Sequence, residues 1–192
     1  MILILTGTPG TGKDTIAAEL AKKGWDWIPL NRIVEKHKLW KRKERGCKVA
    51  DLNRLKREVL KEIIEFGKCR KRKEKNVMIE GHLACEMEIP ADICIVLRAS
   101  PRVLERRLKR RGYLQAKVDE NLMCEILDYC TQKAEANLEC PVYEVRSDKS
   151  LKKTMSDITA IITGSKMARN LRAGWVDWSG YLLRERSQRK RI

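Results

Sequence analysis

Five short runs rich in apolar residues recur along the chain and predict strands. The run over 93–97 is apolar without alternation, which is typical of a strand buried on both faces of a parallel sheet. The five runs cover residues 2–5, 25–29, 76–79, 93–97 and 142–145. Between them, apolar residues recur at three- and four-residue spacing, which predicts helices. The helices are expected over 13–23, from Asn31 to 36 with Asn31 as the cap, and over 51–66, 101–111, 119–138 and 151–164. Alternating strands and helices predict an α/β fold with right-handed crossovers.

A glycine-rich stretch, 7–15, joins the first predicted strand to the first predicted helix. Strand, glycine-rich turn and helix in this order are the context of a phosphate-binding loop. Gly10 and Gly12 let backbone amides close around phosphate oxygens, and the helix N-terminus adds partial positive charge. Lys13 supplies a full charge to the β- and γ-phosphates of a nucleoside triphosphate. We therefore predict that ATP and Mg²⁺ bind at this loop.

One position departs from the usual form of this motif. The residue after the lysine is commonly Ser or Thr, whose hydroxyl ligates Mg²⁺, but here it is Asp14. A carboxylate is a good oxygen ligand for Mg²⁺, although it brings negative charge beside the phosphates. Thr15 keeps a hydroxyl and is a candidate for the α-phosphate. The sequence thus predicts nucleotide binding and leaves the efficiency of catalysis open.

The third predicted strand ends in Glu80-Gly81-His82. A carboxylate at a strand end fits the Walker-B role of organising Mg²⁺ and its waters, and an ordinary strand-end charge is the alternative. His82 is by itself also consistent with a structural role. The phosphate-binding loop earlier in the chain favours functional roles for both side chains. Arg98 ends the fourth predicted strand, where open α/β sheets bind ligands.

The composition is strongly basic, with 42 Lys and Arg against 26 Asp and Glu and a net charge of +16. Such a surplus favours polyanionic partners. The seven cysteines include no Cys-x-x-Cys pair, so we expect reduced thiols in a cytosolic or nuclear compartment and no zinc site. The first strand begins at residue 2 and no apolar run is long enough to span a bilayer, so neither a signal peptide nor a membrane partner is expected.

The last segment, 165–192, differs in composition from the rest of the chain. It holds eight Lys or Arg against two acids, with Trp175, Trp178 and Tyr181 between them. One interpretation is a solvated tail whose tryptophans dock onto the domain. The other is an RNA-binding arm, because cations follow phosphates while aromatic rings stack on bases. The composition does not separate the two.

Five short motifs together resemble one family. They are Gly7-Thr8-Pro9-Gly10-x-Gly12-Lys13, Glu80-Gly81-His82, Ile95-Val96-Leu97-Arg98, Arg111-Gly112-Tyr113 and Glu120-Asn121-x-x-Cys124-Glu125-Ile126. Their order and spacing resemble adenylate kinase isoenzyme 6, the small nuclear adenylate kinase of eukaryotes with archaeal counterparts. The resemblance covers roughly residues 1–160 and leaves the basic tail outside.

The resemblance implies the P-loop nucleoside-monophosphate (NMP) kinase fold, a five-stranded parallel sheet flanked by helices. It places an NMP-binding insertion at about 30–53 and a short lid at about 110–120, within a kinase domain over 1–164. Residues 165–192 would then form a basic, tryptophan-containing C-terminal extension. Arg32 departs from the family, because an acidic residue is expected near the start of the NMP helix.

The resemblance also implies activities and partners. These are phosphoryl transfer from ATP to AMP or another NMP, giving two ADP, and ATP hydrolysis. It further implies a role in small ribosomal subunit maturation and rRNA processing, with a small-subunit ribosomal protein of the platform as partner. The basic surface, and the tail that lies outside the resemblance, make rRNA a further candidate partner. The location would be cytoplasmic in an archaeon and nuclear in a eukaryote. The alternatives are a nucleotide-switched assembly or RNA-binding factor with weak kinase activity, and a small-metabolite kinase.

Carried over by position, the resemblance assigns roles to individual residues. The ATP-binding residues would be Gly10, Gly12, Lys13, Asp14, Thr15 and the lid residue Arg111. The catalytic residues would be Lys13, Glu80, His82 and Arg111, and the Mg²⁺ ligands Asp14 and Glu80. The arginines expected to approach the transferring phosphoryl group on lid closure are Arg98, Arg106, Arg110 and Arg111.

Overall fold

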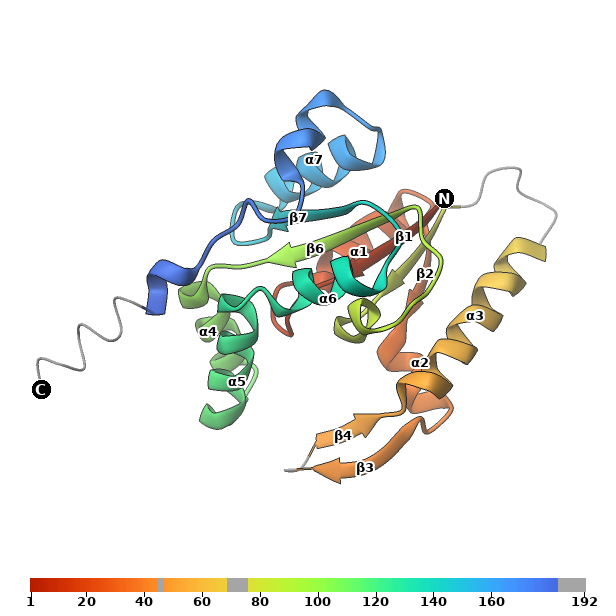
Figure 1. The fold of residues 1–192 in the computed structure, drawn as a ribbon, viewed down its shortest axis with the longest axis horizontal. Helices are drawn as coiled ribbons and strands as arrows, with labels where there is room; N and C mark the ends of the chain where they lie inside the picture. The colour runs from red at the N-terminus through yellow and green to blue at the C-terminus, as the bar shows by residue number, and fades with distance from the viewer. Residues whose placement is uncertain (45–46, 69–75, 183–192) are drawn as a thin grey trace, which may run out of the picture.

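The central sheet has five strands among the residues that the computed structural model describes, which are 1–44, 47–68 and 76–182. The strands are β1 (Ile2–Thr6), β2 (Asp26–Pro29), β5 (Val77–Glu80), β6 (Ile93–Arg98) and β7 (Val142–Arg146). They lie in the order β2-β5-β1-β6-β7, and every neighbouring pair is parallel (Figure 1). Leu3 of β1, for example, pairs with Met78 on one side and Ile93 on the other. The predicted five-stranded parallel sheet is therefore confirmed.

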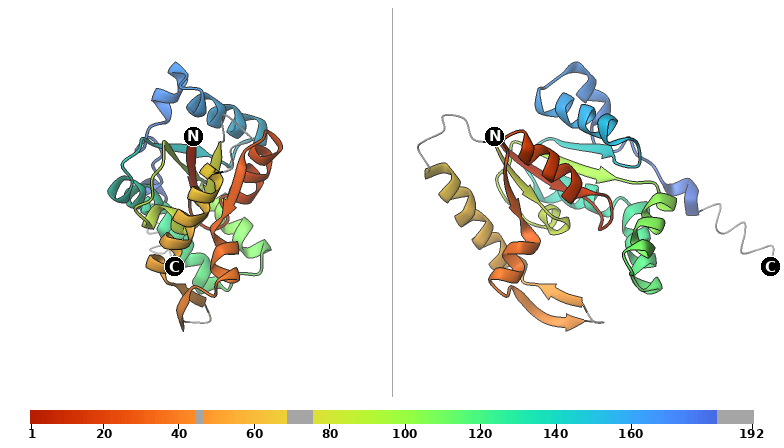
Figure 2. Two further views of the ribbon diagram at one scale, coloured as in Figure 1. Left: turned by 90° about the vertical axis from the view of Figure 1, so that its right-hand side faces the viewer. Right: turned by 180° about the vertical axis from the view of Figure 1, so that it is seen from behind.

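Helices cover both faces of this sheet. They are α1 (Lys13–Lys22), α2 (Leu30–Lys36), α3 (Leu52–Lys68), α4 (Pro101–Arg110), α5 (Gln115–Ile126), α6 (Tyr129–Asn137) and α7 (Leu151–Ile162), with 3-10 helices at His82–Glu86 and Lys166–Leu171. Figure 1 shows α6 in front of the sheet, and the rear view in Figure 2 shows α1 in front. Successive residues of β1 serve opposite faces: Leu3 and Leu5 pack with α1 and α7, and Ile4 packs with α3 and α6. The unbroken apolar strand follows from this double burial.

One predicted helix, over 119–138, is two helices in the structure. The chain breaks between α5 and α6 at Asp128, which has a left-handed backbone with φ of 55°. At this break the Asp128 carboxylate contacts the Arg98 guanidinium. The sequence did not predict this ion pair. Met123 and Leu127, which are apolar residues of the predicted helix, are exposed. A tertiary ion pair thus overrides the helical periodicity at this point.

The region over 30–53 also differs in detail from the expectation. Helix α2 begins at Leu30 directly after Pro29, so Asn31 lies inside the helix and does not cap it. An antiparallel hairpin that the sequence did not predict follows, with strands β3 (Trp40–Glu44) and β4 (Cys47–Ala50). The hairpin strands pair with each other and stand away from the central sheet (Figure 1). Without burial on the sheet, they carry no apolar run that would mark them in the sequence.

The described part of the C-terminal segment, 165–182, packs against the body. It runs from α7 toward α4 (blue in Figure 1). Ala168 and Val176 are buried, and the amide of Ala173 donates a hydrogen bond of 3.1 Å to the carbonyl of Val142 in β7. The guanidinium of Arg172 lies 4.7 Å from the ring centre of Tyr143. These contacts match the docked interpretation of this part, and 183–192 lie outside the described residues.

The cysteines with described side chains are free. Cys85, Cys94 and Cys130 are buried, as the interpretation of core thiols expected, and Cys124 and Cys140 are half-buried. Within the described ranges no helix has the length and apolar character that a bilayer crossing needs.

Candidate nucleotide-binding site

The phosphate-binding loop is held tightly between β1, β6 and α1. Gly7 has φ of 134°, and a Cβ there would lie 2.4 Å from the carbonyl oxygen of Leu97 in β6. Gly12, with φ of 94°, is the N-cap of α1. Both conformations disfavour side chains with a Cβ, and the Gly7 contact leaves no room for one. The loop therefore follows the backbone path that the glycine pattern predicted, with the N-terminus of α1 directly behind it.

Lys13 lies inside this loop. Its ammonium donates hydrogen bonds to the carbonyl oxygens of Gly7, at 2.8 Å, and Thr8, at 3.1 Å. The side chain is buried, and burial lowers the pKa of Lys13, although the nearby carboxylate of Glu80 acts in the opposite direction. A desolvated cation held by neutral carbonyls lacks a counter-charge in direct contact. The anionic oxygens of a phosphate would supply one.

Glu80 and His82 lie next to the loop because β5 is the immediate neighbour of β1. Burial raises the pKa of Glu80, the charge of Lys13 lowers it, and the charge of Asp14 raises it. Burial lowers the pKa of His82 to about 4, and the charges of Lys13 and Lys117 act in the same direction. His82 is therefore neutral at pH 7 and is suited to hydrogen bonding with a ligand or water.

Asp14 is in the first turn of α1, with its side chain 66% exposed. Its carboxylate lies 4.0 Å from the guanidinium of Arg111, the residue that ends α4. Among the described residues no group of three or more His, Cys, Asp or Glu is placed to hold a metal ion. Asp14 and Glu80 nevertheless fit Mg²⁺, which commonly takes one or two carboxylates and completes its shell with phosphate oxygens and water.

A cleft of about 290 Å³ adjoins the loop on the side of α4 and α7. Its lining residues are Gly10, Thr11, Gly12, Thr15, Ile16, Arg107, Arg110, Arg111, Ser147, Lys149, Leu151 and Thr154. Arg107 spans the cleft wall, because its guanidinium donates a hydrogen bond of 2.8 Å to the carbonyl of Ser147 and lies 3.4 Å from the carbonyls of Gly10 and Thr11. The sequence had pointed to the glycines, Thr15, Arg110 and Arg111, but not to Arg107 or the segment after β7.

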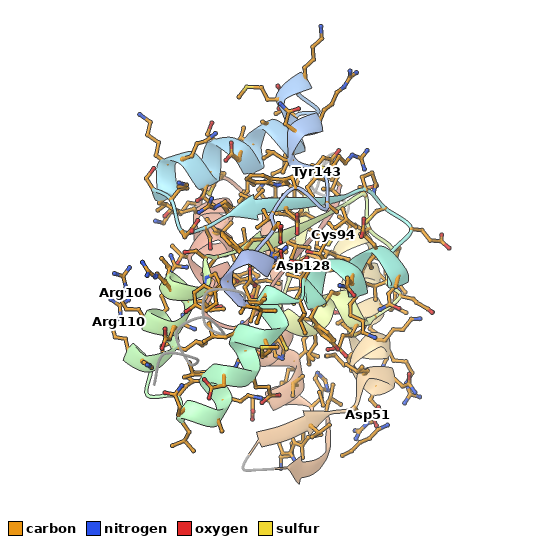
Figure 3. The ribbon with its side chains drawn as sticks, turned by 60° about the vertical axis from the view of Figure 1, so that its left-hand side comes forward. Asp51, Cys94, Arg106, Arg110, Asp128 and Tyr143 are labelled. Atoms are coloured by element: carbon orange, nitrogen blue, oxygen red, sulfur yellow. The ribbon has the colours of Figure 1, made fainter. Side chains whose placement is uncertain are left out.

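Arg98 does not line the cleft. The prediction that it approaches the transferring phosphoryl group is therefore wrong. It is 1% exposed and ion-paired with Glu125 at 2.8 Å, and it also contacts Asp128 and Glu144. Burial acts to lower the pKa of Arg98, but these carboxylates outweigh it and raise the pKa. Arg106 extends from the outer face of α4 (Figure 3) and does not line the cleft. Of the four predicted arginines, Arg110 and Arg111 reach the site.

Glu125 belongs to the last of the five motifs, but sequence reasoning gave it no role at the site. One of its carboxylate oxygens accepts a hydrogen bond of 2.6 Å from the hydroxyl of Thr8 in the phosphate-binding loop. The other accepts a bond of 2.8 Å from Arg98. An acid within the core-facing part of a predicted helix was the available signal, because a buried carboxylate needs charged or hydrogen-bonding partners.

Comparison with known proteins identifies the family. Residues 3–128 match the model of a family described as an AAA domain. A protein named "Putative adenylate kinase" from Archaeoglobus fulgidus is 34% identical over 180 residues, which cover 93% of this chain and 92% of the relative. This chain belongs to the putative adenylate kinase family. A relative of the same name from Methanosarcina mazei is 37% identical over 176 residues and covers 84% of this chain and 87% of its own length.

A solved structure agrees on the fold. A deoxyadenosine kinase from M. mycoides, with the products dCMP and dCDP, superposes with a TM-score of 0.53 over 85% of this chain and 100% of its own. At 17% identity this likeness shows the fold alone. The fold is therefore that of a P-loop kinase, as predicted. The narrower resemblance to adenylate kinase isoenzyme 6 stays a prediction.

Proposed function

We propose that this protein transfers the γ-phosphoryl group of ATP to a nucleoside monophosphate, with AMP as the first acceptor to test. The observation that carries the proposal is the position of Lys13, a buried cation within a glycine loop that adjoins an open cleft. Membership of a family named for adenylate kinases supports the choice of substrates.

The ATP phosphates would occupy the loop, and the base would enter the cleft beyond it. The loop amides, Lys13 and the N-terminus of α1 provide the positive potential for the phosphates. Ile16 and Leu151 give the cleft apolar surface, while Ser147 and Thr154 give it polar atoms. This mixture suits a heterocyclic base, which needs apolar contact and a few hydrogen bonds.

Asp14 and Glu80 would hold Mg²⁺, which neutralises charge on the β- and γ-phosphates when it is bound. Glu80 must be ionised to act as a ligand, and its raised pKa means that ionisation is costly without a cation nearby. The neighbouring Lys13 already reduces that cost. The ionised form of Glu80 would therefore be more stable with a cation bound beside it than without one.

Catalysis would consist of positioning and charge neutralisation. The acceptor phosphate of AMP is already anionic, so no general base is required to activate it. Arg110 and Arg111 end α4 beside the cleft, where they would contact the transferring group as the lid over 110–120 closes. Neutral His82 would orient an oxygen of the acceptor or of a water, and water in an open lid would turn transfer into ATP hydrolysis.

The acceptor would bind between the insertion and the lid, as the family resemblance implies. In Figure 1 the hairpin β3–β4 and helices α4 and α5 extend on the same side of the sheet. Arg32 is exposed on α2 in this insertion, so it is available to an acceptor phosphate or base. Its exchange for the usual acidic residue is a reason to test several acceptors.

The test is ADP formation from ATP with AMP, each of the other common nucleoside monophosphates, deoxyadenosine and a small-metabolite acceptor such as shikimate. Kinase activity predicts ADP production that depends on one or more nucleoside monophosphates. ADP production that is the same with and without every acceptor would show an ATPase and contradict the proposed transfer. For the loss of Lys13 in this assay, Lys22→Ala is the control variant, because Lys22 is exposed at the far end of α1 and pairs with Glu19.

A second function is favoured by one specific feature of α4. Arg102, Arg106 and Arg110 are exposed at four-residue spacing, so they form one row along the helix. A row of arginines matches a chain of phosphates, and the net charge of +16 acts in the same direction. We propose that this row contacts rRNA during small-subunit maturation, with a ribosomal protein of the platform as the accompanying partner.

The RNA proposal is tested by binding of an rRNA fragment across a salt titration. Replacing Arg102 and Arg106 with Glu should weaken binding and flatten its salt dependence, because fewer counterions are released. Arg110 is left unchanged in that variant because it also lines the cleft. Unchanged binding would contradict a role for this row.

A further inference from the structure

The docked C-terminal segment covers a buried cluster with an excess of negative charge. The cluster is formed by Arg98, Glu125, Asp128, Thr131 and Glu144, and its single guanidinium contacts all three carboxylates. Glu125 and Glu144 each have side chains only 1% exposed. One cation cannot satisfy all the acceptor positions of these buried carboxylates, so further donors are needed.

The segment from Gly174 to Trp178 supplies those donors. The amides of Gly174 and Val176 donate to Oε2 of Glu144, at 3.0 and 3.1 Å. The indole of Trp175 donates to the backbone carbonyl of Glu144 at 2.8 Å. The indole of Trp178 donates to Oε1 of Glu125 at 3.3 Å. Trp178 thus donates to a carboxylate of the cluster, whereas Trp175 donates to the backbone of Glu144.

Glu125 connects this segment to the phosphate-binding loop. Its Oε1 accepts from Trp178, from Arg98 and, at 3.0 Å, from the amide of Ala99. Its Oε2 accepts from the hydroxyl of Thr8 at 2.6 Å. Both oxygens belong to one planar carboxylate, so a rotation that changes the bonds of Oε1 also moves Oε2 away from Thr8.

Thr8 in turn shapes the place where Lys13 lies. Its carbonyl oxygen accepts the Lys13 ammonium at 3.1 Å and the Thr11 hydroxyl at 2.8 Å. A carboxylate that holds the Thr8 hydroxyl therefore also fixes the carbonyl that orients the phosphate-binding lysine. From Trp178 to Lys13 the connection is continuous and passes through Glu125 and Thr8.

We propose that Trp178 is a positioning residue of the nucleotide site, acting through Glu125 on Thr8 of the phosphate-binding loop. The C-terminal segment then contributes to ATP affinity without touching ATP. Trp178 lies far from Thr8 in the sequence and outside the cleft at the loop. This inference rests on the proposal that ATP binds at that loop.

The experiment compares Trp178→Phe with Trp175→Phe. Each variant keeps an aromatic ring and removes one indole N–H donor from the same segment. Titration calorimetry with a non-hydrolysable ATP analogue should show affinity about fivefold weaker for Trp178→Phe, at the low end of the usual coupling between two linked sites. Trp175→Phe should bind as the wild type does, since its bond goes to Glu144. Thermal midpoints show whether both variants are folded.

A double-variant cycle tests the route. Thr8→Val alone should weaken binding, and adding Trp178→Phe to it should weaken binding no further, because both changes interrupt the same connection. Additive losses would show that Trp178 acts by another route and would overturn the inference. Equal affinities for Trp178→Phe and the wild type would also overturn it.

A measurement on the wild-type protein covers the case in which Trp178→Phe does not fold. Coupling between two sites is reciprocal, so the ATP analogue should shift the ¹⁵N-indole resonance of Trp178 more than that of Trp175. A Trp178 resonance that the bound analogue leaves unmoved would overturn the inference. A wild-type protein that binds no analogue at all would instead contradict the proposed nucleotide site on which the inference rests.

Discussion

The carboxylate of Asp14 and the guanidinium of Arg111 lie 4.0 Å apart, with their side chains 66% and 49% exposed. They come from the start of α1 and the end of α4, so the pair joins the phosphate-binding loop to the proposed lid. An exposed pair of this kind contributes at most about 1 kcal/mol to stability. The pair matters for function, because Arg111 is proposed to contact ATP and Asp14 is proposed to ligate Mg²⁺. The two side chains that would hold these ligands lie beside each other.

Asp14→Thr should make ATP affinity less dependent on Mg²⁺. The exposed carboxylate repels the phosphates by about 1 kcal/mol when no metal offsets its charge, because water screens it. Without Mg²⁺, the variant should therefore bind ATP about fivefold more tightly than the wild type. Titration of ATP across a series of Mg²⁺ concentrations measures this difference. Coincident curves for the two proteins would show that Asp14 does not act on the bound nucleotide.

Lys13→Ala should abolish turnover and leave the fold intact. The kcat is expected to fall by at least about a hundredfold, because the main positive charge at the phosphates is removed. The folded state should not suffer, since Lys13 is a desolvated cation that burial disfavours. ADP production and the thermal midpoint are measured together, with Lys22→Ala as the surface control. Full activity in a folded Lys13→Ala protein would refute the site.

His82 should make stability depend on pH between about 4 and 6.5. Its pKa is lowered to about 4 in the folded protein from 6.5, so in this window the unfolded chain binds more protons than the folded one. The free energy of unfolding therefore decreases as pH falls through the window, by up to about 3 kcal/mol. Urea denaturation of the wild type and His82→Gln at several pH values measures this slope.

The His82→Gln variant should lose that part of the slope, because it has no imidazole to protonate. His37→Gln is the matched control, since His37 is the other histidine and lies on α2's C-terminal side, away from the loop. An identical slope in the wild type and His82→Gln would mean that His82 is not buried as a neutral group.

Removal of residues 165–192 should destabilise the protein more than removal of 183–192 does. The longer deletion takes away the donors to Glu125 and Glu144 and uncovers two buried carboxylates. The expected loss is at least about 3 kcal/mol, since bonds to charged groups are worth about 1.5–3 kcal/mol each. Urea denaturation of both truncated proteins measures it. Equal stability of the longer truncation and the full chain would contradict an integral role for the segment.

The sequence by itself determined the sheet and the phosphate-binding loop. Five runs rich in apolar residues, alternating with helical segments, predicted strands of a parallel sheet, and the loop glycines allow the backbone that Gly7 and Gly12 adopt. These features are local, because each depends on side-chain size or apolar character within a few residues. The position of Glu80 beside the loop also required the strand order, in which β5 is the neighbour of β1.

Tertiary structure alone decided the partners of the charged residues. Arg98 has the strand-end position typical of a ligand-binding residue, but acids from α5, the α5–α6 break and β7 surround it. The helix break at Asp128 lies in the same cluster. Trp175 and Trp178, for which composition allowed either a docked tail or an RNA-binding arm, donate hydrogen bonds to residues of this cluster. The spacing of charged residues along the chain does not identify their ion-pair partners, so long-range pairing cannot be deduced from local sequence. The pairing is fixed only in the folded protein, where residues distant in the sequence donate hydrogen bonds to the buried carboxylates.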